Sequence, residues 1–167
     1  MTVRILPAAP AHAAGIARVI RSGWEQTYVP PLTPDWFAAH PVEDWVRSWE
    51  RSLQSPPLPG SARLVAVDDD GVVVGIGTAG APRAGAHPMD DARDAELHIL
   101  YVSFEYQGTG VARALVEGLL PGGVPAQLWV ADPNPRAQAF YRKMGFADDG
   151  ATDSASFAPL RMIRMVR

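Results

Sequence analysis

Cysteine is absent from this sequence of 167 residues. Its absence excludes disulfide bonds, zinc sites built on thiolates, iron–sulfur clusters and a cysteine nucleophile. The sequence also lacks a run of 18 apolar residues, so it predicts no membrane-spanning helix. Together these absences favour a cytoplasmic protein that has no membrane partner.

Positive charge is scarce as well. Lys143 is the only lysine, and 15 Lys and Arg residues are outnumbered by 18 Asp and Glu residues, which gives a formal net charge of −3. This balance excludes a protein that covers nucleic acid with a basic surface, so we expect no nucleic-acid partner. Hydrophobic residues make up 47% of the chain, which predicts one globular domain over residues 1–167.

Two periodicities divide the chain. Helical spacing of apolar residues predicts helices over 13–24 and 42–53, and another helix starts at Thr33-Pro34-Asp35. From residue 61 the spacing changes to that of strands, and Asp70-Gly71 suits the tight turn of a β-hairpin. Strands are expected over residues 3–6, 63–67, 72–77, 96–104, 127–130 and 161–166. A long loop over 80–94 and two further helices complete a mixed α/β sheet with helices packed on it.

The segment 107–112, Gln-Gly-Thr-Gly-Val-Ala, is a candidate anion site. It follows an expected strand and opens an expected helix, where backbone N–H groups and the helix dipole favour a group such as pyrophosphate. By itself the pattern favours a plain strand-to-helix turn, and only its place between an expected strand and an expected helix supports the anion site. It is neither a Rossmann fingerprint, because Arg113 stands where the last glycine belongs, nor a Walker loop, which ends in Gly-Lys-Ser/Thr.

Two segments in order resemble the GNAT superfamily of acyl-CoA-dependent N-acyltransferases. Residues 96–102 followed by 107–112 are similar to the central strand and pyrophosphate-binding turn of that family, and residues 134–146 are similar to its N-x-x-A-x-x-F-Y-x-x-x-G-F motif. The resemblance implies a single α/β domain with a mixed, mostly antiparallel central sheet flanked by helices. It also implies acetyl-CoA as co-substrate, a small-molecule or peptide amine as acceptor, no metal, and a homodimer, which is common in the family.

The resemblance assigns the acetyl-CoA contacts residue by residue. It implies that the backbone of Tyr101 and Val102 pairs with the pantetheine arm, that the N–H groups of 108–112 surround the pyrophosphate, and that Asn134 approaches the pantetheine. The full set of expected cofactor-binding residues is Tyr101, Val102, Gln107, Gly108, Thr109, Gly110, Val111, Ala112 and Asn134.

Three side chains are candidates for proton transfer. The resemblance gives Glu96 as the general base for the amine, and the alternative is a glutamate exposed at a strand edge. His98 is expected on the same side of the strand and is a second base candidate, although a hydrogen-bonded core histidine is the commoner use. Tyr141 is expected to face the thioester sulfur and to protonate the leaving thiolate, while its place in an apolar helical stripe also fits a core residue.

Aromatic residues crowd the N-terminal third. Trp24, Tyr28 and Trp36 are weak candidates for an acceptor pocket, and the i, i+4 pair Trp45 and Trp49 is expected in the core. The carboxylates of 90–94 are expected to lie in a solvated loop. The alternative is that their negative charge attracts a cationic amine. The sequence thus predicts an N-acetyltransferase, with a non-catalytic acyl-CoA-binding module as the alternative.

Overall fold

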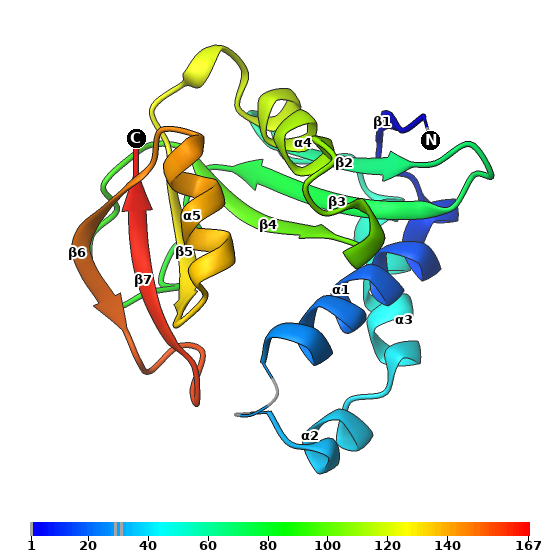
Figure 1. Ribbon diagram of the computed structural model, residues 1–167, viewed down its shortest axis with the longest axis horizontal. Helices are drawn as coiled ribbons and strands as arrows, with labels where there is room; N and C mark the ends of the chain where they lie inside the picture. Colours follow the sequence, from blue (N-terminus) through cyan, green and yellow to red (C-terminus); the bar gives the residue numbers. More distant parts are fainter. Residues whose placement is uncertain (1, 29, 31) are drawn as a thin grey trace.

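The computed structural model describes residues 2–28, 30 and 32–167, and these residues form one seven-stranded sheet in the order β1-β2-β3-β4-β5-β7-β6 (Figure 1). The strands are β1 (Arg4–Pro7), β2 (Ala62–Val67), β3 (Val73–Gly80), β4 (Glu96–Val102), β5 (Gln127–Asp132), β6 (Ala147–Asp153) and β7 (Arg161–Val166). The helices are α1 (Ala13–Thr27), α2 (Pro34–Ala39), α3 (Val42–Gln54), α4 (Val111–Leu119) and α5 (Pro135–Lys143), with 3₁₀ turns η1 (Pro10–His12), η2 (Phe104–Tyr106) and η3 (Pro121–Gly123).

The sheet is mixed and mostly antiparallel, as the resemblance implies. Every neighbouring pair of strands is antiparallel except β4 and β5, which run parallel. The single parallel contact joins two halves of the sheet, and in Figure 1 the strands on either side of it point in clearly different directions.

Helices cover the two faces unequally. On one face, α4 and α5 share a core with Leu128 and Val130 of β5. On the other face, α1 and α3 pack over the first half of the sheet, where their apolar residues meet Ile76 of β3 and Ile99 of β4. Trp45 and Trp49 pack against this second core, which confirms their expected place. In the part of the chain that the structure describes, no helix combines the length and the apolar character that a bilayer crossing requires.

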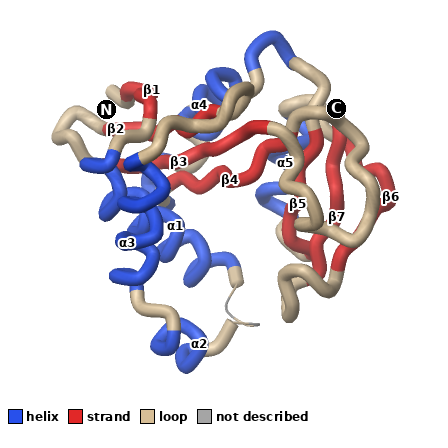
Figure 2. Tube along the Cα trace, turned by 180° about the vertical axis from the view of Figure 1, so that it is seen from behind, coloured by secondary structure: helices blue, strands red, loops and turns tan. Residues whose placement is uncertain are grey.

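The segment 81–95 covers the second half of the sheet on the face opposite α5 (Figure 2). It connects β3 to β4 and contacts side chains of β5, including Gln127 and Trp129. The long loop expected over 80–94 is therefore present, and it acts as a cover for strands that α1 and α3 do not reach.

Local sequence signals explain the start of α2 and the turn between β2 and β3. The side chain of Thr33 accepts a hydrogen bond from the Trp36 N–H at 3.2 Å and caps α2, as expected of a threonine before proline. Gly71 has a φ of 80° in the turn between β2 and β3, a conformation that glycine adopts without strain.

The sequence interpretation was wrong about β6, which it did not include. Every residue of Ala147–Asp153 except Ala151 and Asp153 is exposed, and the segment has no large apolar side chain, so it carries no hydrophobic alternation. They form a strand because they pair with β7, through contacts such as Thr152 with Ile163. Pairing with a distant segment, and not local preference, makes this strand.

Candidate functional site

A gap opens between β4 and β5 immediately beyond their only parallel contact among the described residues. The two strands pair at Glu96 with Gln127 and at Leu97 with Leu128, and then diverge (Figure 1). The backbone groups on the edge of β4 away from β3 consequently face this gap along the later part of the strand and have no neighbouring strand.

The register of β4 identifies which backbone groups face the gap. The Ser103 N–H donates to the Val74 carbonyl at 2.9 Å, and Tyr101 lies opposite Ile76 two residues earlier. In an antiparallel pair, hydrogen-bonded positions alternate with positions whose groups point to the opposite edge. Tyr101 therefore directs its backbone to β3, whereas Val102 directs its N–H and C=O toward the gap.

The turn at 107–112 lies at the end of this edge. Gly108 and Gly110 have φ values of 79° and 95°, and Gly110 is the N-cap of α4, where it supplies no side chain to cap the helix. The first-turn N–H groups of a helix have no acceptor within the helix. The turn thus presents unpaired donors and the positive end of the α4 dipole, which together suit an anion.

Gln107 ties this turn to two other elements. Its side-chain N–H donates to the Val102 carbonyl at 3.0 Å, and its Oε1 accepts from Arg136 of α5 at 2.6 Å. Arg136 thereby adds a positive charge beside the turn. The sequence analysis did not identify Arg136 as a site residue. It lies 29 positions from Gln107, and no local sequence pattern indicates that the two side chains meet.

Asn134 caps α5, since its Oδ1 accepts from the Ala137 N–H at 3.2 Å. This contact confirms the expected helix start. It also fixes the orientation of the side chain, so that the amide NH₂ group is the part of Asn134 free of the cap.

Tyr141 of α5 lies deep in the core shared by α4 and α5 and is 9% exposed. Its ring makes edge contacts with Phe140 and Phe146. Burial first, and the nearby Tyr28 phenol second, raise the pKa of Tyr141 far above that of an ordinary phenol. The hydroxyl is therefore protonated at any pH near neutrality.

The phenols of Tyr28, at the end of α1, and Tyr101 of β4 lie near enough to Tyr141 to influence its ionisation or be influenced by it. Burial, followed by the Tyr28 phenol, also raises the pKa of Tyr101 well above its usual value, and Tyr141 contributes to that rise. The Tyr101 ring lies against Gly23, where an added Cβ would approach its Cδ1 to 2.6 Å. Glycine in α1 lets the helix and the tyrosine come together. Three phenols from three elements thus share one region at the gap.

Trp24 joins this group to the expected acceptor pocket. Its ring stacks on Trp36 at 5.5 Å and makes edge contacts with Tyr28 at 5.6 Å and Trp45 at 5.3 Å. The structure brings the three pocket candidates together, but Trp24 also packs on the α1–α3 core. Its indole N–H is buried, faces the Tyr101 hydroxyl and has no aligned acceptor among the described residues.

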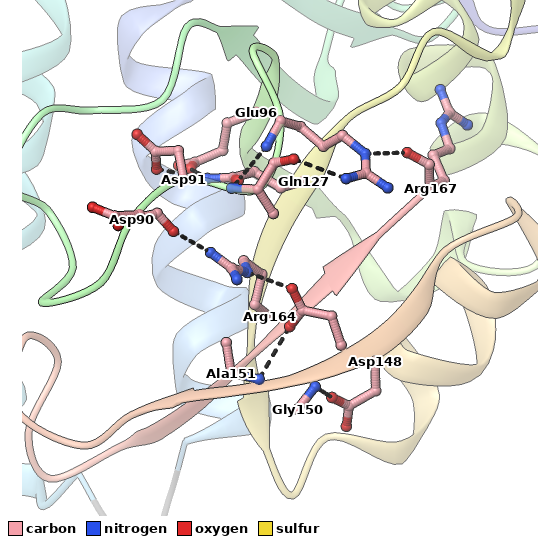
Figure 3. Close-up of polar contacts among 12 residues, drawn as sticks. Asp90, Asp91, Glu96, Gln127, Asp148, Gly150, Ala151, Arg164 and Arg167 are labelled. Atoms are coloured by element: carbon pink, nitrogen blue, oxygen red, sulfur yellow. Dashed lines mark hydrogen bonds and ion pairs between the residues drawn. The ribbon is translucent and has the colours of Figure 1, made fainter.

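Glu96 lies at the closed end of the gap and is 2% exposed, which rules out the alternative of a glutamate in solvent. Its Oε2 accepts from the Gln127 side chain at 2.8 Å, as Figure 3 shows. The Gln127 Oε1 accepts the backbone N–H groups of Ala92 and Arg93, so the amide is oriented with its NH₂ toward Glu96 and Asp91. Gln127 is a second residue that sequence reasoning missed, because only the folded loop reveals its partners.

His98 is a neighbour of Glu96, with 4.0 Å between its Nε2 and Glu96 Oε1. The Nε2 atom lies 2.9 Å from the carbonyl of Ala81. A carbonyl only accepts, so Nε2 carries the hydrogen and Nδ1 has the lone pair. Burial lowers the pKa of His98 more than the Ala81 carbonyl and Glu96 raise it, and the ring is therefore neutral at pH 7.

Metal ligands do not gather in this region. Over residues 2–28, 30 and 32–167, the structure contains no cluster of three or more His, Asp or Glu side chains that could hold a metal ion.

Solved structures similar to this chain share its whole fold. The apo form of YjaB from Escherichia coli superimposes with a TM-score of 0.68 at 21% identity, covering 99% of this chain and 97% of that one. PaiA N-acetyltransferase from Thermoplasma acidophilum, solved in complex with coenzyme A, gives 0.67 at 20% identity over 98% of both chains. Phosphinothricin acetyltransferase from Sinorhizobium meliloti, in complex with AcCoA, gives 0.67 at 21% identity over 100% and 88%.

Sequence similarity to curated relatives covers a shorter region. An uncharacterized N-acetyltransferase from Mycobacterium tuberculosis is 43% identical over 65 residues, which are 36% of this chain and 42% of the relative. The match thus spans less than half the length of the curated relatives. Residues 23–146 match the family described as the acetyltransferase (GNAT) family, and they contain β4, the turn at 107–112 and α5. On this match over most of its length, the chain belongs to the GNAT family of acetyltransferases.

Proposed function

We propose that this protein transfers an acetyl group from acetyl-CoA to a primary amine by direct attack in a ternary complex. The observation that carries the proposal is the continuous path from the turn at 107–112 along the free edge of β4 to the buried phenol of Tyr141. Acetyl-CoA matches this path in chemistry, since it has an anion at one end, an amide-bearing arm in the middle and a thioester at the other.

Each part of the cofactor has a matching group in this proposal. The N–H groups of 108–112 and the charge of Arg136 hold the pyrophosphate. Val102 pairs with the pantetheine amides as an added strand would, and Tyr101 contributes its side chain because its backbone faces β3. The amide NH₂ of Asn134 approaches the same arm.

The chemical step needs two proton movements. The amine nitrogen bonds to the carbonyl carbon, and its surplus proton passes to Glu96 directly or through a bridging water. A backbone N–H on the free edge of β4 stabilises the oxyanion. The carbon–sulfur bond then breaks, and Tyr141 donates its proton to the departing thiolate. The raised pKa of Tyr141 keeps its hydroxyl protonated until this step.

The proposal is tested by mixing the protein with acetyl-CoA and a panel of primary amines and measuring free thiol release. The protein has no cysteine and so contributes no thiol background. Turnover with any amine supports transfer, whereas binding of acetyl-CoA with no turnover would favour the non-catalytic acyl-CoA-binding module instead.

The base assignment has its own test. Glu96→Gln keeps the shape of the side chain but cannot take a proton, so turnover should fall by about 10²-fold or more while acetyl-CoA affinity stays the same. Asp91→Asn is the matched control, because it alters the other, exposed carboxylate that Gln127 contacts. Full activity in Glu96→Gln together with loss of activity in His98→Ala would move the role to His98.

A further inference from the structure

Gln127 lies beside Glu96 at the closed end of the gap. The two residues are opposite one another in the parallel contact between β4 and β5, and the Gln127 backbone N–H donates to the Ala95 carbonyl at 2.8 Å, which fixes this register. Gln127 is completely buried. A buried amide is costly unless its donors and acceptors are paired, so the partners of Gln127 indicate what this residue does.

All four hydrogen-bonding positions of the Gln127 amide are occupied. Its Oε1 accepts from the backbone N–H groups of Ala92 and Arg93, at 2.7 and 3.1 Å. Its Nε2 donates to Oδ1 of Asp91 at 3.0 Å and to Oε2 of Glu96 at 2.8 Å (Figure 3). A reversed amide would set its NH₂ against two N–H groups and its oxygen against two carboxylates. The orientation of the amide is therefore fixed.

This contact makes the two oxygens of the Glu96 carboxylate unequal. Oε2 accepts from Gln127, whereas no hydrogen bond reaches Oε1 among the described residues. The Nε2 of His98 lies 4.0 Å from Oε1 and is hydrogen-bonded to the Ala81 carbonyl. The fully buried polar atoms that lack a partner in the described part of the chain do not include Oε1. Oε1 is thus the oxygen that a group in the gap can reach.

The contact that orients Glu96 carries no charge. The Arg93 guanidinium binds the carbonyls of Arg167 and Ala92, and no arginine pairs with Glu96 among the described residues. An arginine would favour the ionised carboxylate so strongly that it would weaken the base, whereas a neutral amide orients the carboxylate at a smaller loss of basicity. The charged and titratable groups in this region are Asp91, Arg93 and Arg83 of the segment 81–95, His98 of β4 and Arg164 of β7.

We propose that Gln127 is a positioning residue for the general base: it holds Glu96 by Oε2 and leaves Oε1 to take the proton of the acceptor amine. This inference rests on the proposed function and specifies the atom at which the proton arrives. The amine nitrogen loses the proton as it bonds to the carbonyl carbon, and Oε1 gains it directly or through the bridging water. Gln127 keeps its own hydrogens throughout, and no bond forms or breaks at its amide.

Gln127→Glu tests this role with a side chain of nearly the same shape. Its Oε1 can still accept from the backbone N–H groups of Ala92 and Arg93, but an oxygen replaces the NH₂ group that lies 2.8 Å from Glu96. Two carboxyl groups at this distance share one proton and keep it to a higher pH than a single carboxyl group does. Asp91 is exposed and can turn into solvent, so the shared proton stays on the buried pair.

The kinetic measurement is the ratio of kcat/KM for benzylamine in Gln127→Glu to that in the wild type, across a range of pH. The protonation of benzylamine itself cancels from this ratio. The ratio should be about 0.1 or less near pH 6 and should rise about tenfold per pH unit while the pair loses its shared proton. The KM for acetyl-CoA should not change. A ratio that is independent of pH in a folded Gln127→Glu protein would overturn the positioning role.

Arg93→Met is the matched control for a role of Gln127 that is only structural. The Arg93 side chain fastens the segment 81–95 to the Arg167 carbonyl at 2.9 Å, and His87 fastens the same segment through its Nδ1, which lies 2.7 Å from Oδ2 of Asp153. Removing the guanidinium loosens the segment and leaves the Gln127 amide in place. Its ratio to the wild type should be the same at every pH. A pH-dependent ratio like that of Gln127→Glu would mean that Gln127 only holds the segment, and the proposal would be wrong.

Proton–nitrogen NMR of the Gln127 side-chain NH₂ tests the orientation without turnover, and it decides the proposal even if Gln127→Glu does not fold. Glu96→Gln should move the signal of one NH₂ hydrogen and Asp91→Asn that of the other, because each hydrogen has its own carboxylate. If Glu96→Gln moves neither signal, the proposed orientation is wrong.

The two tests separate this inference from the proposed function. If both NH₂ hydrogens respond as expected and no amine is acetylated, the proposed function is wrong and only the orientation of Glu96 stands. If benzylamine is acetylated and the ratio for Gln127→Glu does not change with pH, the positioning role is wrong and the proposed function stands.

Discussion

Tyr141 combines two uses of one side chain. Its ring fills the core between α4, α5 and β5, while its hydroxyl lies in the region that also holds the phenols of Tyr28 and Tyr101. A phenol in such a place is protonated far beyond neutral pH, which is the state that a proton donor to a thiolate requires. The packing role is shown by the contacts of the ring, and the donor role is part of the proposed mechanism.

Replacing Tyr141 by Phe separates these two uses. Tyr141→Phe deletes one oxygen and keeps the ring, so folding and acetyl-CoA binding should survive while the rate of the chemical step falls by about 10²-fold. Single-turnover thiol release, measured alongside thermal unfolding, checks both parts. Wild-type turnover under conditions where chemistry limits the rate would leave Tyr141 only its packing role.

The pH profile adds an independent measure of the same residue. Because the pKa of Tyr141 is raised, activity should rise as the amine loses its proton and should not decline near pH 10, where an ordinary phenol ionises. A decline at or below pH 10 that disappears in Tyr141→Phe would show that the hydroxyl is less buried in the working enzyme than in this structure.

At the scale of elements, the turn at 107–112 and the start of α4 form the proposed anion site. Gly110 is the N-cap of α4 and has a φ of 95°. Because it has no side chain, the space beside the first-turn N–H groups of α4 is open. An added Cβ would meet no atom within 4 Å. A long acidic side chain at this position therefore has room, although the positive φ strains any residue other than glycine, and it would occupy the space of the pyrophosphate and repel it.

Gly110→Glu should remove the stabilisation that acetyl-CoA provides. At a concentration about 100 times its dissociation constant, the ligand should add about 2.7 kcal/mol to the free energy of unfolding of the wild-type protein. Gly60→Glu is the control, since Gly60 also has a positive φ of 75° and open surroundings but lies in the connection before β2. If acetyl-CoA stabilised the Gly110→Glu protein as strongly as the control, the turn would not be the pyrophosphate site.

For the whole molecule, the contact of His87 with Asp153 joins the covering segment 81–95 to the last strands of the sheet. The folded-state pKa of Asp153 lies below its unfolded value near 4, so its contribution to stability is complete above about pH 4 and is lost as the pH falls further. Acid should therefore loosen this half of the protein first.

Chemical denaturation at several pH values checks this expectation. Asp153→Asn should be less stable than the wild type at pH 7, because the amide cannot accept from His87 and the backbone as a carboxylate does. The difference in free energy of unfolding between the two proteins should shrink as the pH falls from 4 toward 2, because Asp153 then takes up a proton more readily in the unfolded chain than in the folded one. Other acidic groups titrate alike in both proteins and cancel from the difference. A difference that stays constant over this range would contradict the ionised state of Asp153.

Short-range stereochemistry in the sequence determined much of the architecture. Asp70-Gly71 specified the β2–β3 turn, Thr33-Pro34 and Asn134-Pro135 specified helix starts, and the glycines of 107–112 specified a strand-to-helix turn open to a ligand. These features depend on residues within a few positions of one another, so the sequence alone predicts them. The resemblance to the family, confirmed over 23–146, rests on the same local segments.

Only the tertiary structure decided the features that depend on distant segments. The polar strand β6 exists because β7 pairs with it, and Glu96 is buried because Gln127 and the segment 81–95 close over it. The register of β4 turned Val102 and not Tyr101 toward the gap, and His87 and Asp153, which lie in contact, are 66 positions apart in the sequence. Burial, strand pairing and hydrogen-bond direction arise from the assembled sheet, because each requires two surfaces that meet only after the chain has folded.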